Sequence, residues 1–181
     1  MIVVDCSALI AIFEKEPDAV VFAQAIQQAD RLLISAVNAH ETGIVLRARH
    51  GVMALGRMWR FLQSENDFEI VPFDEAQARE AIAAFERYGK KMNPKARLNL
   101  ADCAAYALAK RLAAAQNVSP DAAIRGALEE RARAAGVIAE ARRARRRMTV
   151  DQMLAVGDEI AAMPLLDTRS PHQIMDDVNA L

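Results

Sequence analysis

Three carboxylates of this chain lie where apolar strands give way to helices, a placement suited to metal chemistry. Asp5 directly follows the apolar run at residues 2–4, and Glu41 and Asp102 lie near the starts of later apolar helical patterns. In an open parallel sheet the carboxyl ends of the strands line one crevice, where ligands bind. Three negative charges there repel each other unless a divalent cation neutralises them, and magnesium or manganese prefers such oxygen ligands. The three acids therefore predict a metal-dependent enzyme.

The histidines and cysteines predict neither a zinc site nor a disulfide framework. His40 and His50 have no third partner at zinc spacing, so a zinc site is not expected, and His172 is given no role. Cys6 and Cys103 each follow a candidate aspartate, which indicates packing beside a site rather than a disulfide framework. We therefore expect a reducing, cytoplasmic setting.

Composition limits the class of protein. A chain of 181 residues that is 53% hydrophobic can form one ordinary domain plus an appendage. The formal net charge of -1 gives no global preference for nucleic acid, although arginines crowd residues 142–147, which could form a solvated helix face, a phosphate-binding strip or an internal partner for the acids. No signal peptide and no apolar segment of the roughly 20 residues needed to span a membrane is recognised, so we expect no membrane span.

Apolar runs and amphipathic stretches alternate over the first 110 residues, which is typical of a parallel α/β fold. Ser7 is the expected N-cap of the first helix, and Gly51 is the expected end of the third. The helix at 75–88 is expected to pack inward through Ala78, Ile82 and Phe85. The predicted strands are 2–4, 32–35 and 68–73, and the other predicted helices of this region are 7–16, 19–29, 38–51, 53–64 and one that carries Asp102.

A basic, turn-rich loop at residues 89–97 leads to the helix that carries Asp102. Its cations are expected near the acidic cleft, where they could guide an RNA backbone: Lys90, Lys91, Lys95 and Arg97. After about residue 110 the chain becomes rich in alanine and arginine and predicts only helices. One such helix begins at Ser119 and another at Thr149, and the tail at 163–181 is expected to be irregular.

The first 110 residues resemble the PIN-domain ribonuclease toxins of the VapC type. The resemblance rests on the segments at 1–12, 41–46 and 99–110, each of which contains one of the three acids. It implies a three-layer α/β/α fold with a short parallel sheet, truncated relative to the family. It also implies one or two Mg²⁺ ions that activate water for attack on an RNA phosphodiester. Asp5 and Asp102 would be the main metal ligands.

The same resemblance implies supporting roles around the metal. Glu41 would complete the ligand set directly or through water, and Ser7 and Asn99 would orient the carboxylates. Alternative roles remain for single acids. Asp102 alone could be a first-turn charge on the helix dipole, and a mid-helix glutamate such as Glu41 is usually solvated.

The remaining chain resembles the partner antitoxin, VapB, at residues 112–131 and again at 160–177. We therefore expect two units, a PIN-like domain at 1–110 and a helical antitoxin-like extension at 111–181. The family's last strands and fourth acid are missing, which would leave the first strand at a sheet edge. The antitoxin's DNA-reading strand is missing too, so specific DNA binding is not expected. Arg169 is the candidate for an inhibitory contact with the acids.

Two functions follow from these observations. The first is a magnesium-dependent endoribonuclease of a type II toxin–antitoxin system, self-inhibited by its C-terminal extension. The second is a catalytically silent fusion that binds or sequesters a partner. The expected partners are RNA, an antitoxin-like protein or the chain's own C-terminal segment, and further copies of the chain.

Overall fold

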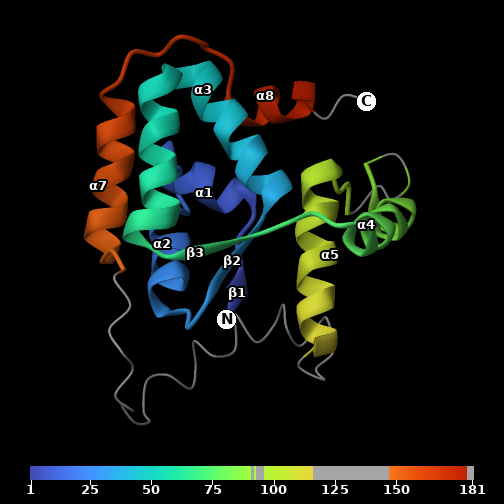
Figure 1. Ribbon diagram of the computed structural model, residues 1–181. Helices are drawn as coiled ribbons and strands as arrows, with labels where there is room; N and C mark the ends of the chain where they lie inside the picture. Colours follow the sequence, from blue (N-terminus) through green and yellow to red (C-terminus); the bar gives the residue numbers. More distant parts are fainter. Residues whose placement is uncertain (91, 93–95, 116–146, 179–181) are drawn as a thin grey trace.

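The sheet of this protein has three parallel strands, shown in the computed structural model of Figure 1, which describes residues 1–90, 92, 96–115 and 147–178. The strand order is β1 (Ile2–Val3), β2 (Leu32–Ser35), β3 (Phe68–Val71). All four residues of β2 are buried, as expected for a central strand. The predicted parallel α/β class is confirmed, and β1 lies at an edge of the described sheet, as predicted.

The first helix, α1 (Cys6–Phe13), begins at Asp5 rather than at Ser7. The Oδ1 atom of Asp5 accepts a hydrogen bond from the backbone N–H of Ala8 at 2.9 Å. The prediction of Ser7 as the N-cap is therefore wrong, because the extended backbone of the strand continues through Asp5 and the carboxylate caps the helix directly. Ser7 lies exposed in the first turn.

The next helices are α2 (Ala19–Gln28) and α3 (Ala36–Trp59), and α3 continues into a π-helical turn, η1 (Arg60–Glu65). Helix α3 is broken at Gly51, where φ is 81°. This left-handed conformation favours glycine, so the predicted end of a helix at this residue is confirmed. The break turns the second half of α3 back across the core (Figure 1).

Helices α4 (Glu75–Tyr88) and α5 (Leu100–Ala115) pack against each other beside the sheet (Figure 1). The predicted bounds of α4 are confirmed, but its predicted inward face is wrong: Ile82 is 61% exposed and Phe85 is 38% exposed. Ala81 and Ala84 are buried instead, because the neighbouring surface of α5 presents small residues to which only a stripe of small side chains fits closely. Cys103 and Ala107 form that surface.

Helix α7 (Val150–Ala161) packs against α1, α2 and α3. Thr149 and Gln152 form a reciprocal capping box at its start, which confirms Thr149 as the cap. The side chains of Met153, Val156 and Ile160 are fully buried in the main hydrophobic core. Part of the C-terminal extension thus belongs to the same core as the N-terminal helices.

The tail contains a further helix, α8 (Pro171–Val178), so the prediction that this segment is irregular is wrong for these residues. Ser170 and Gln173 cap it: the backbone N–H of Gln173 donates to Ser170 Oγ at 3.2 Å, and the N–H of Ser170 donates to Gln173 Oε1 at 2.8 Å. The predicted helix from Ser119 and the arginines at 142–146 lie outside the described residues. Among the described helices, none is both long and apolar enough to cross a membrane.

We expect Ile160→Ala to lower the free energy of unfolding by about 2–5 kcal/mol, because it leaves a cavity in the shared core. Urea denaturation measures the change. Leu165→Ala, at a side chain that is 50% exposed, is the control and should change it by less than about 0.5 kcal/mol. Equal, small effects of both substitutions would show that α7 is not part of the core.

Candidate metal centre

The three predicted acids lie at the starts of three helices. Asp5 links β1 to α1, Glu41 lies in the second turn of α3 just after β2, and Asp102 lies in the first turn of α5. Asp5 and Asp102 are half-buried, whereas Glu41 is only 4% exposed. Helices α3 and α5 both contact the sheet. Asp5 and Glu41 follow the carboxyl ends of β1 and β2, and these ends form the edge where the ligands of such folds bind.

Electrostatic effects show that the acids lie near one another. Burial raises the pKa of Asp102, and the negative charge of Asp5 raises it further, although a hydrogen bond from Asn99 opposes the rise. Burial likewise raises the pKa of the Cys6 thiol, and both Glu41 and Asp5 add to that rise. Since Asp5 acts on both groups, the structure brings the three acids into one region.

The donor set fits a hard divalent cation best at two of the acids. Within the described residues, no three side chains of His, Cys, Asp or Glu lie close enough together to hold a metal ion. Mg²⁺ is commonly held by one or two carboxylates together with waters and substrate phosphate. Asp5 and Asp102, which repel each other and are partly removed from water, fit that pattern. The three-carboxylate ligand set remains a prediction.

Asn99 orients the carboxylate of Asp102. Its backbone N–H donates to Asp102 Oδ2 at 2.8 Å, and its side-chain Oδ1 accepts from the N–H of Asp102 at 2.8 Å. This reciprocal pair is a capping box at the start of α5. It fixes the Oδ2 atom of the carboxylate against the backbone at the start of α5.

Asn38 is a residue of this region that the sequence analysis missed. It is 1% exposed, and its Nδ2 donates to the carbonyl of Ala101 at 3.2 Å, which joins α3 to α5 beside Asp102. Its Oδ1 is buried without a hydrogen-bond partner. A polar residue in the first turn of a helix is usually a solvated or capping group. Nothing in the local sequence therefore predicts that Asn38 joins two helices.

The tail helix α8 reaches the acids from the other side. Lys90 Nζ donates to Asp176 Oδ1 at 2.6 Å, and Cys6 Sγ, next to Asp5, donates to Met175 Sδ at 3.6 Å. The charge of Lys90, and that of His172 when its imidazole is protonated, lowers the pKa of Asp102. His172, for which the sequence predicted no role, is therefore the tail residue that acts on the site. The sequence feature that could have predicted this role is Ser170-Pro171, which marks the start of α8 and so places His172 one turn before Asp176.

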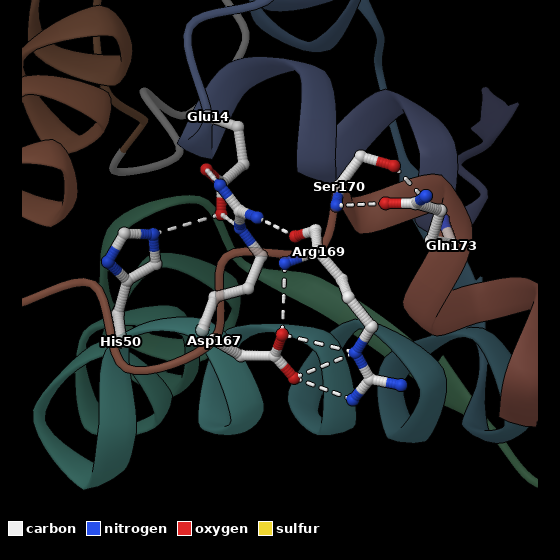
Figure 2. A network of polar contacts seen from close by, with 7 residues as sticks. Glu14, His50, Asp167, Arg169, Ser170 and Gln173 are labelled. Atoms are coloured by element: carbon white, nitrogen blue, oxygen red, sulfur yellow. Dashed lines mark hydrogen bonds and ion pairs between the residues drawn. The ribbon is translucent and has the colours of Figure 1, made fainter.

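Arg169 does not make the inhibitory contact expected of it. Its guanidinium pairs with Asp167 at 2.6 Å (Figure 2). It also pairs with Asp177, another acid of the tail. These local acids are close in sequence or on the adjoining helix, and they hold Arg169 away from the predicted contact. The guanidinium in turn lowers the pKa of Asp167 to about 2.

The backbone of Arg169 has a separate function in the fold. Its carbonyl accepts a hydrogen bond from Arg49, which is itself held by Glu14 at 3.0 Å and 3.1 Å (Figure 2). His50 Nε2 lies 3.1 Å from the same carboxylate. This largely buried cluster fixes the chain just before α8.

The other residues that the sequence predicts for the site are Ser7 and the four cations of the basic loop. Lys90 and Arg97 are exposed, and both lower the pKa of Asp176, so they lie near the tail helix. Ser7 is exposed beside Asp5, and its predicted role in orienting a carboxylate stays a prediction. Lys91 and Lys95 lie outside the described residues.

The chain belongs to the PIN-domain family. Residues 2–127 match the PIN domain, and residues 96–178 match the Rv0623-like transcription factor family. The two matches overlap at 96–127, so the predicted boundary at residue 110 lies within the overlap and stays a prediction.

Several similar proteins are named VapC ribonucleases. Ribonuclease VapC28 of Mycobacterium tuberculosis is 40% identical over 107 residues, which cover 59% of this chain and 80% of the relative. Ribonuclease VapC of Mycolicibacterium smegmatis is 38% identical over 108 residues, covering 60% of this chain and 82% of the relative. Ribonuclease VapC36 of M. tuberculosis is 38% identical over 109 residues, covering 60% and 77%. The expected resemblance to PIN-domain toxins of the VapC type is confirmed.

In metal-free buffer we expect Asp102→Asn to raise the melting temperature at pH 7. A raised pKa means that the native state binds this proton more tightly than the unfolded state, so the charged Asp102 opposes folding above its native pKa. The gain should shrink as the pH falls to about 4 and below, where the carboxyl is protonated in both states. Asparagine keeps an oxygen that can accept from Asn99.

Scanning calorimetry in EDTA at pH 7 and pH 4 measures this effect. Asp18→Asn, at an exposed residue that makes no side-chain cap, is the control and should show no such dependence. A lower melting temperature of Asp102→Asn at pH 7 would contradict the interpretation of Asp102 as a charge held at a stability cost.

Proposed function

We propose that this protein is a metal-dependent endoribonuclease of the toxin type, with Asp5 and Asp102 as metal ligands and Glu41 assisting. The observation that carries the proposal is that Asp5 and Asp102 lie close enough together for the negative charge of Asp5 to raise the pKa of Asp102. It occurs in a PIN-family chain whose relatives are named ribonucleases. Acids kept close together at the expense of stability are typical of functional sites.

Magnesium is the proposed metal, with manganese as the other suitable ion. When bound, the ion would supply an activated water and positive charge beside the phosphate under attack. Asn99 holds the Asp102 carboxylate in one orientation through the 2.8 Å bond from its N–H. Asn38 fixes the start of α5 to α3 through the Ala101 carbonyl. These bonds would keep the acids in place when their charge is neutralised.

Lys90 and Arg97 are proposed to bind the RNA backbone, together with Lys91 and Lys95 of the same loop. Contacts to phosphate position a nucleic acid without reading its sequence, so this loop gives affinity rather than a cleavage preference. Lys90 and Arg97 both lower the pKa of Asp176, and Lys90 also lowers the pKa of Asp102. Lys90 is therefore close to both carboxylates. An RNA strand held there would pass the acids. Such an enzyme would act in the cytoplasm.

The second candidate is a catalytically silent module, and the position of the tail favours it. Helix α8 lies against Cys6 and Lys90, so the extension already occupies part of the region that RNA would use. Under this alternative, the antitoxin-like segment blocks the site permanently, or the chain sequesters a partner. We favour a case intermediate between the two candidates, in which the same segment restrains an active enzyme. Self-association, expected from the position of β1 at an edge of the described sheet, stays a prediction.

Metal binding separates the two candidates. We expect Mg²⁺ at a hundredfold excess over its dissociation constant to raise the free energy of unfolding of the wild-type protein by about 2.7 kcal/mol. Asp5→Asn should lose most of this gain, while asparagine preserves the cap on Ala8. Chemical denaturation with and without Mg²⁺ measures both. A permanently blocked module would show no gain in either protein.

Cleavage of a labelled structured RNA tests the activity itself. We expect cutting with Mg²⁺, none with EDTA, and a loss of at least about 100-fold in Asp5→Asn, since a metal ligand supplies several kcal/mol of transition-state stabilisation. Asp18→Asn, which removes an exposed acid at the start of α2, is the matched control and should cut like the wild type. Absence of cutting by folded wild-type protein would favour the silent module.

A further inference from the structure

Asp176 is an acid surrounded by cations. Lys90 Nζ donates to its Oδ1 at 2.6 Å, and this bond is the main reason that the pKa of Asp176 is lowered. His172, one turn earlier on α8, and Arg97, from the basic loop, lower the pKa further. Three basic side chains from two segments therefore act on one carboxylate.

Lys90 also acts on the metal centre. Its charge, and that of His172 when the imidazole is protonated, favours the ionised form of Asp102. Lys90 is therefore near enough to Asp102 to influence its pKa and is at the same time held by Asp176. The carboxylate of Asp176 thus takes a place where an anionic group of a substrate would meet Lys90.

Contacts on both sides of Asp176 fix its position. Ile174 is 3% exposed and belongs to the main core, and Met175 Sδ accepts from Cys6 Sγ at 3.6 Å. Before the helix, the carbonyl of Arg169 accepts from Arg49, which the Glu14 carboxylate holds (Figure 2). Helix α8 is therefore docked by its apolar face, and Asp176 projects toward Lys90 from a defined place.

We propose that Asp176 is an internal substitute for an RNA phosphate. Its carboxylate pairs with Lys90, one of the cations assigned to the RNA backbone, and an incoming RNA strand has to displace it. This inference rests on the proposed ribonuclease function and deepens it, because it names how the extension restrains the site. The restraint acts on substrate binding through Asp176, unlike the contact with the acids expected of Arg169.

The strength of the ion pair suits a contact that substrate can displace. The side chains of Lys90 and Asp176 are 39% and 40% exposed, and exposed ion pairs contribute little to stability. Removing the carboxylate should therefore tighten RNA binding only about two- to fivefold at low salt. The effect should fade as salt is raised, because ions screen exposed charges.

Binding of a fluorescein-labelled single-stranded RNA to the full chain in EDTA tests the proposal without cleavage. We expect Asp176→Asn to bind about two- to fivefold more tightly than the wild type at 50 mM salt. Asp177→Asn is the matched control, since it removes the same charge one residue further along, from an acid that pairs with Arg169 and not with Lys90. It should tighten binding distinctly less.

A second measurement tests the ion pair without RNA. Acylation of Lys90 by an amine-reactive reagent, followed by mass spectrometry, should be faster in Asp176→Asn than in the wild type and unchanged in Asp177→Asn. Melting temperatures near that of the wild type would show that both variants keep α8 docked.

The outcomes separate this inference from the proposed function. Wild-type binding of RNA with no tightening in Asp176→Asn, or with equal tightening in Asp177→Asn, would overturn phosphate substitution and leave the ribonuclease proposal standing. Unchanged acylation of Lys90 would overturn it as well. Failure of every folded variant to bind RNA would overturn the proposed function, and this inference with it.

Discussion

The close contact between α7 and α1 is the constraint on which the position of the tail depends. Gly157 lies so near the carbonyl of Ile12 that a Cβ atom there would be 2.5 Å from its oxygen. Helix α7 can therefore bury Met153, Val156 and Ile160 against the N-terminal helices only with glycine at this position. Because the extension is fixed in the core by this packing, the chain that follows is delivered to the face of the molecule that carries the acids.

Buried charge determines how α7 is aligned. The Arg57 side chain is only 6% exposed and pairs with Glu65 at 2.7 Å and with Glu159 of α7. A buried ion pair adds little net stability, because removing the charges from water costs nearly as much as their attraction returns. An alignment of α7 that separates Glu159 from Arg57 would leave this buried guanidinium with Glu65 alone, so such an alignment is disfavoured. The same logic applies to Glu14 and Arg49, which fix the chain before α8.

Local signals in the sequence predicted much of this fold. Apolar runs gave the three strands, and Gly51 and Thr149 marked the end of one helix and the start of another. The acids were placed near one another because parallel strands deliver their ends to one edge. Strand ends and caps depend on neighbouring residues, which is why they can be predicted from the sequence.

The features that were missed depend on partners distant in sequence. The inward face of α4 follows from the small residues of α5, and the amphipathic pattern of Ile82 and Phe85 says nothing about that neighbour. The contact of Arg169 is decided by competition between nearby acids and the site, and proximity favours Asp167. His172 acts on Asp102 only because packing brings α8 there.

The charge pattern of the site links the two halves of the chain. Asp5 and Asp102 leave negative charge that water only partly solvates, and such a group attracts any cation within reach. Lys90 opposes part of that negative charge, and Asp176 in turn balances Lys90. The tail thus presents an anion to the basic loop, where an RNA phosphate would bind. Binding of RNA to Lys90 would therefore remove one reason for α8 to stay, without touching the core that holds α7.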